Sequence, residues 1–339
     1  MVQRCSKQQS ARRSPPSIHR PGKNLDPSAV ASYLPGPMSS DHAGAPAAHS
    51  KLQTFFRRLF TTVVLWALVL GALFSGNLLV ADLALLAVVA VITVFALLEF
   101  CDLVQRRGIA CFRSYAVATG VLFVSAVWLA ETGLLSDKVS PLVVNLALGG
   151  SIVIGLFVRR LFWTDMENGL AAVGGTLLAL VYIPWLLGFL MSVYFHSEDN
   201  GSWWLLYFIL VTKASDMGAY SVGSLIGRHK MIPRVSPGKT WEGLGGALAV
   251  STGASLAFAH FAHDRLVGMT FSHALILGLL LGGGAVVGDL VESLFKREAG
   301  VKDSGAYFPG IGGVLDLVDS LLFNAPIMFA YLVWLTTSQ

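Results

Sequence analysis

Residues 288–320 combine acidic and basic side chains with a glycine-rich turn, in a chain that is otherwise poor in charge. Only 13% of all residues are charged, yet this stretch holds four Asp, two Glu, two Lys and one Arg. Ionisable groups next to or inside a membrane are costly unless they are paired or hydrated, so they mark a site by default. Carboxylates, lysines and a Pro-Gly-x-Gly-Gly turn can together hold a divalent metal against a phosphate. A solvated loop between two helices would explain the charge, but not the glycines or the helical spacing of the acids.

The acids of this stretch are spaced as on helices. Asp289, Glu292 and Ser293 follow the i, i+3, i+4 pattern and therefore share one helical face. Asp316 and Asp319 repeat the i, i+3 spacing at the start of the final predicted helix, where negative charge also suits the helix dipole. Capping alone would explain only one of these two acids. Both acidic helix ends are predicted to face a cationic cluster that consists of Lys296, Arg297 and Lys302.

A second polar group, Lys213, Ser215 and Asp216, interrupts an apolar segment that begins with two tryptophans. Lys213 and Asp216 are three residues apart and so are neighbours on one helical face. Charged residues within a membrane usually mark a pathway or a site, although an ion pair that only pins two helices together stays an alternative. Small residues around the pair allow a neighbouring helix to approach closely. They are Ala214, Gly218, Ala219 and Gly223.

The run Ser236-Pro-Gly-Lys-Thr240 invites comparison with a P-loop, but the comparison fails. A Walker A motif needs a glycine five positions before Gly238, and that position is Pro233. The run still suits a phosphate, because Lys239 supplies a point charge, Ser236 and Thr240 supply hydroxyls, and a helix is predicted to start here. A helix cap formed by Ser236 or Thr240 is a simpler alternative and is compatible with phosphate binding.

Composition identifies the setting of these motifs. Hydrophobic residues make up 54% of the chain, and apolar runs long enough to span a bilayer recur from Leu59 to the C-terminus. We therefore predict an all-α, polytopic integral membrane bundle of about nine helices. They are expected at 59–76, 78–99, 114–131, 141–158, 169–192, 203–224, 243–263, 271–291 and 320–337.

The first fifty residues differ from the rest of the chain. Residues 1–50 are rich in Ser, Pro, Ala, Arg and His and cannot bury a core, so we expect a disordered tail before a membrane domain over 51–339. A secretory signal peptide is not expected, because the first apolar run begins too late. A transit peptide and a start codon assigned too far upstream stay open. The three cysteines, Cys5, Cys101 and Cys111, lack metal-ligand spacing and are interpreted as ordinary small apolar residues.

Loop charges predict the orientation in the membrane. With the N-terminus in the cytoplasm, the inner loops hold twelve Lys and Arg residues and the outer loops hold only Lys138 and Arg265. The positive-inside rule therefore favours a cytoplasmic N-terminus, as in a bacterial inner-membrane protein. The odd helix number then puts the C-terminus outside. Both motif-rich loops, 225–242 and 294–319, would face the cytoplasm, where nucleotides are found.

The charged stretch resembles the signature of the phosphatidate cytidylyltransferase (CDP-diacylglycerol synthase) family. That signature can be written S-x-x-K-R-x4-K-D-x5-P-G-H-G-G-x-x-D-R-x-D. It corresponds here to Ser293, Lys296, Arg297, Lys302, Asp303, Pro309, Gly310, Gly312, Gly313, Asp316 and Asp319. The upstream block, Asp216-x-Gly-Ala-Tyr220 and Ser236-Pro-x-Lys-Thr-Trp-Glu-Gly243, is also similar. The resemblance covers roughly 55–339.

Three positions depart from the family pattern. Ile311 replaces the usual His, Leu317 replaces the usual Arg, and Gly238 replaces the common second Lys of the upstream block. Every acid of the pattern remains, so the metal ligands are kept while the environment of the anions changes. A divergent subgroup with unchanged chemistry, a different lipid phosphate as acceptor, and loss of activity are the three alternatives.

The resemblance implies transfer of CMP from CTP to phosphatidic acid, which yields CDP-diacylglycerol and pyrophosphate for phospholipid biosynthesis. It implies no nucleic acid as partner, and it allows a homodimer. The candidate catalytic residues are Asp289, Asp316, Asp319, Lys296 and Lys302. The candidate substrate-binding residues are Lys213, Ser215, Ser236, Lys239, Thr240, Arg297, Gly312 and Gly313. The candidate ligands of one or two Mg²⁺ ions, with a monovalent cation as an option, are Asp216, Asp289, Asp316 and Asp319.

Two other classes of protein are open alternatives. Another CTP-dependent lipid-phosphate cytidylyltransferase or a lipid kinase would share the style of the fold, but not the full pattern from Ser293 to Asp319. A secondary transporter would explain Lys213 and Asp216 within the membrane, but it should show an internal repeat of interrupted helices. The sequence has no such repeat, and its acids gather at one membrane face, which favours chemistry at the surface.

Overall fold

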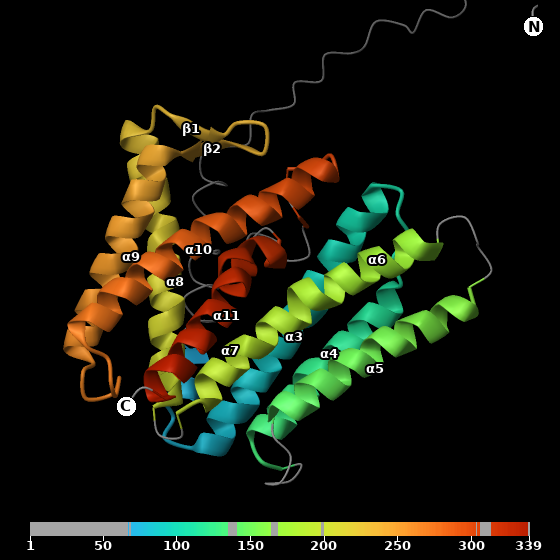
Figure 1. The fold of residues 1–339 in the computed structure, drawn as a ribbon, viewed down its shortest axis with the longest axis horizontal. Helices are drawn as coiled ribbons and strands as arrows, with labels where there is room; N and C mark the ends of the chain where they lie inside the picture. The colour runs from blue at the N-terminus through green and yellow to red at the C-terminus, as the bar shows by residue number, and fades with distance from the viewer. Residues whose placement is uncertain are drawn as a thin grey trace, which may run out of the picture. The chain divides into compact units, whose positions relative to one another are not determined.

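The computed structural model describes residues 67, 69–134, 141–163, 169–197, 200–302, 304–305 and 313–337. The predicted N-terminal tail lies outside these ranges, as does half of the helix predicted at 59–76. The described part is a bundle of long helices with one short β-hairpin, which confirms the all-α prediction (Figure 1). The helices are α3 (Leu78–Arg106), α4 (Arg113–Glu131), α5 (Pro141–Leu161), α6 (Gly169–Leu180), η2 (Val181–Trp185), α7 (Leu186–Phe195), α8 (Gly201–Ile226), α9 (Trp241–Phe261), α10 (Phe271–Glu298) and α11 (Val314–Thr337).

Seven helices of the described part are long and apolar enough to cross a membrane. The segments α6, η2 and α7 count as one of them, because they run on as a single helix over Gly169–Phe195 with a π-helical turn at Pro184. Helix α8 is also long, at 26 residues, but Lys213 and Asp216 make it more polar. Together these eight helices occupy eight of the nine predicted ranges.

The boundaries around both motif regions differ from the prediction. Helix α10 continues to Glu298, so Lys296 and Arg297 lie on a helix rather than in a loop. Helix α11 begins at Val314, six residues before the predicted start at 320. The segment expected to be a loop forms an antiparallel hairpin of β1 (Lys230–Ile232) and β2 (Ser236–Thr240), with Lys230 opposite Thr240. Pairing the two strands satisfies backbone groups that helices α8 and α9 cannot satisfy.

Glycines bring α8, α9 and α10 into close contact, as the small residues around Lys213 predicted. A Cβ atom on Gly218 of α8 would lie 2.5 Å from the carbonyl oxygen of Gly246 on α9. A Cβ atom on Gly278 of α10 would lie 2.6 Å from the Cα atom of Thr252 on α9. Such contacts exclude any larger residue, and close packing of this kind replaces the hydrophobic effect as the force that joins helices in a membrane.

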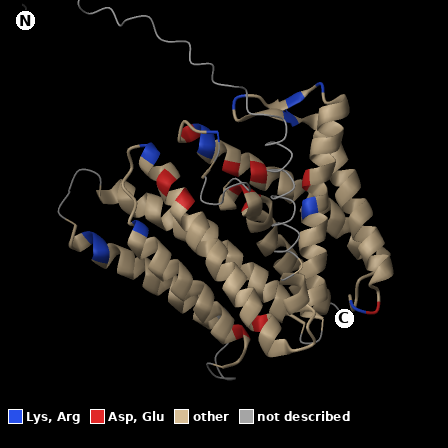
Figure 2. Ribbon diagram, turned by 180° about the vertical axis from the view of Figure 1, so that it is seen from behind, with Lys and Arg blue, Asp and Glu red and all other residues tan. Residues whose placement is uncertain are grey.

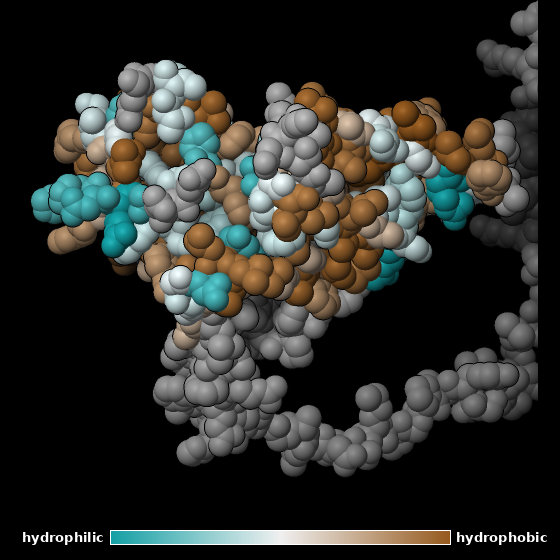
Figure 3. Space-filling view, turned by 90° about the horizontal axis from the view of Figure 1, so that it is seen from below, coloured by the Kyte–Doolittle hydropathy of each residue, from teal (hydrophilic) through white to brown (hydrophobic). Residues whose placement is uncertain are grey.

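The surface of the helices is apolar, as a bilayer requires. Exposed side chains on α5 include Leu146, Ile154 and Phe157, each more than half exposed. Figure 3 views the structure from the side away from the hairpin and shows hydrophobic residues over much of this face. Cys101 and Cys111 are buried among apolar side chains of the core. With its apolar, membrane-length helices, the chain is an integral membrane protein.

Basic residues gather at the end of the bundle that carries the hairpin (Figure 2). The C-termini of α3, α5, α8 and α10 contribute to this end, together with the N-termini of α4, α9 and α11. The acids of the motif regions lie just below it, in the C-terminal part of α10 and the first turns of α11. The basic residues at this end are Arg106, Arg107, Arg113, Arg159, Arg160, Arg228, Lys230, Arg234, Lys239, Lys296, Arg297 and Lys302.

Candidate active site

A cleft of about 550 Å³, here called the polar cleft, lies between the hairpin and helices α8, α9 and α10. Its wall includes Tyr220, Lys230 and four glycines, so that backbone groups as well as side chains line it. This volume falls within the range that small-molecule sites occupy. Five residues predicted from the sequence line the polar cleft, namely Asp216, Ser236, Lys239, Thr240 and Asp289.

Three acids from two helices meet at one edge of the polar cleft. Asp289 and Glu292 of α10 and Asp319 of α11 each place a carboxylate oxygen within 4.8 Å of the other two. Glu292 is fully buried, and Asp319 is 6% exposed. We call these three residues the carboxylate cluster. Three carboxylates at this separation repel one another unless a cation lies among them, and oxygen ligands are those that Mg²⁺ prefers. The cluster therefore fits a divalent ion.

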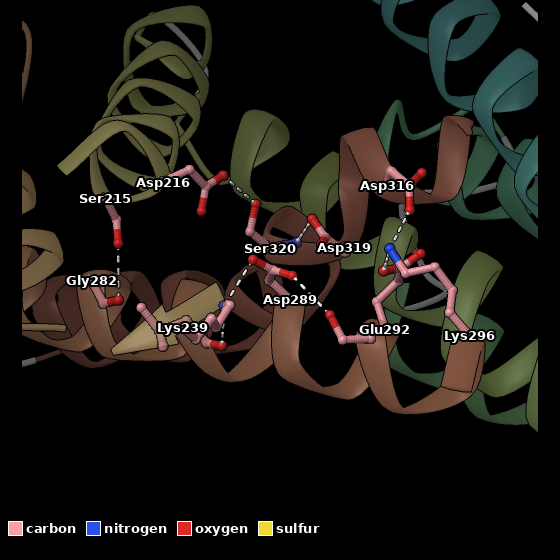
Figure 4. Close-up of polar contacts among 12 residues, drawn as sticks. Ser215, Asp216, Lys239, Gly282, Asp289, Glu292, Lys296, Asp316, Asp319 and Ser320 are labelled. Atoms are coloured by element: carbon pink, nitrogen blue, oxygen red, sulfur yellow. Dashed lines mark hydrogen bonds and ion pairs between the residues drawn. The ribbon is translucent and has the colours of Figure 1, made fainter. Parts of the chain in front are cut away.

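Asp316, a predicted metal ligand, lies beside the carboxylate cluster and is not part of it. Its Oδ1 atom accepts a hydrogen bond from Lys296 Nζ over 2.8 Å, and the same ammonium group forms an ion pair with Glu292 (Figure 4). Lys296 is only 15% exposed and thus bridges α10 and α11 from within the protein. Sequence spacing indicated that Asp316 and Asp319 form a pair, but it could not show that Asp316 would bind Lys296 while Asp319 joins the other acids.

Lys213 and Asp216 form the predicted ion pair, with 3.2 Å between Nζ and Oδ2. The hydroxyl of Ser320 joins them, because it accepts from Lys213 Nζ over 2.9 Å and donates to Asp216 Oδ2 over 3.0 Å. Asp216 is therefore tied to Lys213 and lies outside the carboxylate cluster, and its role as a metal ligand stays a prediction. Ser215 is fully buried and donates to the carbonyl oxygen of Gly282, so its hydroxyl joins α8 to α10 rather than lining the polar cleft.

The hairpin brings a lysine to the carboxylate cluster. Lys239 Nζ lies 2.8 Å from Asp289 Oδ2 and donates to the carbonyl oxygen of Val286. Thr240 is the N-cap of α9, since its Oγ1 accepts from the backbone N–H of Gly243 over 3.1 Å. The predicted cap is therefore confirmed. The backbone N–H of Trp241 at the same helix start donates to the carbonyl oxygen of His229 over 2.9 Å, so this end can favour an anion through the helix dipole. Ser236 lines the same cleft from the start of β2.

The remaining predicted cations lie further out. Arg297 Nε donates to the carbonyl oxygen of Val235 over 3.1 Å and so holds the hairpin against the end of α10. Lys302 is exposed beyond the end of α10. Gly313 is buried, whereas Gly312 lies outside the described residues, together with Asp303 and the segment 306–311. Among the predicted cations, Lys239 and Lys296 contact the carboxylate cluster, whereas Arg297 contacts the hairpin, and the cradle itself stays a prediction.

Glu99 of α3 is a site residue that sequence reasoning missed. It is fully buried, and its carboxylate accepts the backbone N–H groups of Val314 and Leu315 over 2.9 and 2.8 Å. Glu99 also accepts a hydrogen bond from Ser304 Oγ over 3.4 Å. The start of α11 is therefore capped by a residue more than two hundred positions earlier in the chain. An acid within a long apolar helix was the available signal, because such residues are rare without a function.

The arrangement can hold phosphates and a metal side by side. Figure 4 shows Lys239, Asp289 and Glu292 on one side and Asp216, Ser320 and Asp319 on the other. Carboxylates of the cluster and the ammonium groups of Lys239 and Lys296 both border this space, so that a metal ion and the oxygens of a polyanion can each find partners. Ser320 belongs to this set, although its position directly after Asp319 was the only sequence signal for it.

Comparison with known proteins matches the Cytidylyltransferase family model to residues 57–335. A phosphatidate cytidylyltransferase of Haemophilus influenzae is 42% identical over 153 residues, which cover 44% of this chain and 53% of that protein. One from Mycobacterium bovis is 37% identical over 189 residues, with 52% and 60% covered. One from Staphylococcus aureus is 38% identical over 158 residues, with 46% and 58% covered.

The matched segments span a little more than half the length of these curated relatives. The family model itself extends over most of the chain, and it includes both motif regions and every described helix. The carboxylate cluster and the polar cleft lie within the matched residues. This chain belongs to the cytidylyltransferase family.

Proposed function

We propose that this chain transfers CMP from CTP to phosphatidic acid and so makes CDP-diacylglycerol and pyrophosphate. The observation that carries the proposal is the meeting of Asp289, Glu292 and Asp319 with Lys239 and Lys296 at the edge of the polar cleft. Relatives named phosphatidate cytidylyltransferase match the chain at 37–42% identity, which supports the same reaction.

The reaction needs charge stabilisation rather than a strong base. An oxygen of the lipid phosphate attacks the α-phosphorus of CTP, the bond to the bridging oxygen of the β-phosphate breaks, and pyrophosphate leaves. The attacking phosphate is already an anion, so no proton has to be removed. This agrees with the described lining of the polar cleft, which contains no histidine. The difficulty lies in bringing two polyanions together, which cations and in-line positioning overcome.

The two substrates would approach the site from different sides. Lys239, Ser236 and the N-terminus of α9 offer a cation, a hydroxyl and the positive end of a helix dipole to the phosphates of CTP. Lys213 and Ser320 lie on the other side of the carboxylate cluster and are suited to the phosphate of the lipid. Lys296 would hold Glu292 and Asp316 in place between α10 and α11.

The carboxylate cluster would hold Mg²⁺. Asp289, Glu292 and Asp319 supply the oxygen ligands, and Asp216 and Asp316 would act through their lysine partners. A bound Mg²⁺ supplies neutralisation of phosphate charge and a fixed position for the reacting groups. Asp289 is the most accessible of the three, with a side chain that is 40% exposed, so it is the ligand nearest to an incoming substrate.

The active site would face the cytoplasm. The twelve basic residues at the hairpin end contrast with Arg265 at the other end of the described bundle. The positive-inside rule assigns the charged end to the cytoplasm, where CTP is present. The end of α11 lies away from the hairpin and would place the C-terminus outside (Figure 1).

Two isotopic labels in CTP test the proposal. Purified protein in detergent is incubated with phosphatidic acid, Mg²⁺ and CTP labelled in either the α- or the γ-phosphate. Transfer of CMP puts the α label into a CDP-lipid and the γ label into pyrophosphate. A chelator of divalent ions should stop the formation of both the labelled CDP-lipid and the labelled pyrophosphate. Label from the γ-phosphate in a lipid, with diacylglycerol as acceptor, would instead identify a lipid kinase.

A further inference from the structure

A second cavity, here called the apolar cavity, lies between helices α3, α7, α8 and α11. It has a volume of about 150 Å³ and is lined by aliphatic side chains, with one exception among the described residues. Each of the four helices contributes such side chains to the wall, for example Val89 of α3, Leu190 of α7, Ile209 of α8 and Leu321 of α11. The exception is Lys213, the lysine of the ion pair at the active site.

The Lys213–Asp216 ion pair separates the apolar cavity from the polar cleft. Lys213 lines the apolar cavity, and Asp216, three residues further on α8, lines the polar cleft. Lys213 Nζ bonds Asp216 and Ser320, so the ammonium group lies on the polar side while the rest of the residue borders the hydrocarbon walls. A hydrocarbon compartment and a nucleotide-sized compartment therefore meet at one cation.

Helix α11 divides its residues in the same way. Leu317, Val318 and Leu321 line the apolar cavity. Asp319 and Ser320, between them in sequence, belong to the polar site. One turn of this helix thus presents apolar side chains to the first compartment and acceptors and donors to the second. An amphiphile with an anionic head fits this boundary, because its charge would lie at Lys213 and its tail among the aliphatic side chains.

We propose that the apolar cavity binds the part of one acyl chain of the lipid substrate that lies next to its head group. The proposal rests on the proposed function, since it assigns the tail of the lipid acceptor to a place within the same site. From Leu205 through Ile209 to Lys213, α8 borders the cavity over roughly 12 Å of helix at 1.5 Å per residue. The remaining chain length would extend into the bilayer.

Narrowing the apolar cavity should change the preference for chain length. Ile209→Phe replaces an aliphatic side chain of the cavity wall by a larger aromatic one, and Val89→Phe does the same from α3. Leu210→Phe is the matched control, because Leu210 is the next residue of α8, is 40% exposed and does not line the cavity. Turnover is measured with phosphatidic acids that differ only in chain length, from diacetyl to dipalmitoyl.

We expect Ile209→Phe to raise the KM for dipalmitoyl phosphatidic acid at least fivefold, while the KM for CTP and the turnover of the diacetyl lipid, whose chains are too short to reach Ile209, change less than twofold. Leu210→Phe should behave as the unchanged protein at every chain length. An equal effect on all chain lengths, or no effect in both cavity variants, would overturn the proposal.

Photocrosslinking separates this proposal from the proposed function. The unchanged protein is irradiated with a phosphatidic acid that carries a diazirine near the head-group end of one chain, without CTP, and the adducts are mapped by mass spectrometry. Adducts on the segments around Val89, Ile209 and Leu321 are expected. Adducts confined to outward-facing residues such as Leu210 would refute the cavity assignment, even in a protein that makes CDP-lipid. Cavity adducts in a protein that makes no CDP-lipid would refute the reaction alone.

Discussion

The carboxylate of Glu99 accepts the backbone N–H group of Leu315 over 2.8 Å, across 216 positions of the chain. The same group accepts from Val314 and from Ser304, which lie on either side of the glycine-rich turn. Glu99 therefore holds both ends of this turn, and it fixes the N-terminus of α11 against α3. Asp316 follows the capped residues directly, so the position of the acids of α11 depends on a helix that contributes none of the predicted site residues.

Replacing Glu99 by Gln tests this positioning role. The amide keeps the shape but offers one acceptor oxygen, so one of the two N–H groups of α11 loses its partner, at a cost of about 1–3 kcal/mol for a buried group. We expect kcat to fall at least tenfold with a smaller change in the KM for CTP. Glu99→Asp should recover part of the activity. Glu131→Gln is the control, because Glu131 accepts a hydrogen bond from Ser192 on helices away from the site. Equal losses in both Gln variants would leave Glu99 without a special role.

Asp289→Asn should abolish turnover while the protein remains folded in detergent. Asp289 belongs to the carboxylate cluster and contacts Lys239, so its loss removes a metal ligand and a transition-state contact. We expect a decrease in kcat on the order of 10²–10³. The control is Asp264→Asn, at an exposed residue paired only with His263 in the loop after α9. Near-normal activity in Asp289→Asn would remove this residue from the mechanism.

Lys239→Met should weaken the binding of CTP more than that of the lipid. The substitution keeps an apolar stem and removes the ammonium group that contacts Asp289 from β2. An increase of about tenfold in the KM for CTP corresponds to 1.4 kcal/mol of binding energy. Arg234→Met changes a cation in the same hairpin that does not line the polar cleft, and it serves as control. A selective increase in the KM for phosphatidic acid would assign Lys239 to the other substrate.

Reporters should place the two ends of α11 on opposite sides of the membrane. A reporter after Gln339 is expected to behave as periplasmic or extracellular, because the charge distribution puts the hairpin end in the cytoplasm. A cysteine introduced at Arg234, in the hairpin, should react with an impermeant thiol reagent only after the cells are opened, with Cys5, Cys101 and Cys111 replaced by Ser beforehand. A cytoplasmic signal after Gln339 would contradict the predicted topology.

Restoring the family's residues, with Ile311→His and Leu317→Arg, should change the rate only modestly. We expect unchanged chemistry, because Lys239 and Lys296 already supply cations at the carboxylate cluster, and Leu317 borders the apolar cavity. The modest change should be a decrease confined to long-chain lipids, since Leu317→Arg brings charge to that border. A native protein inert towards phosphatidic acid, but active after the double change, would show that these departures alter the acceptor.

Local spacing in the sequence was sufficient for features that lie within one helix. It predicted the ranges of eight long helices, the Lys213–Asp216 ion pair, and the shared face of Asp289 and Glu292. It also predicted the cap at Thr240. Each of these depends only on the 3.6-residue repeat, on apolar length or on a side chain that reaches its own backbone neighbours.

Tertiary structure decided which of these faces meet. Asp319 joins Asp289 and Glu292, whereas Asp316 meets Lys296 and Asp216 meets Ser320, because the register of α11 against α8 and α10 is set by packing. Close contacts such as that of Gly288 with the backbone of α11 set this register, and no spacing within one helix encodes them. The cap by Glu99 and the boundary between the polar cleft and the apolar cavity arise for the same reason. Each requires helices that are distant in sequence to pack in one particular register along their axes.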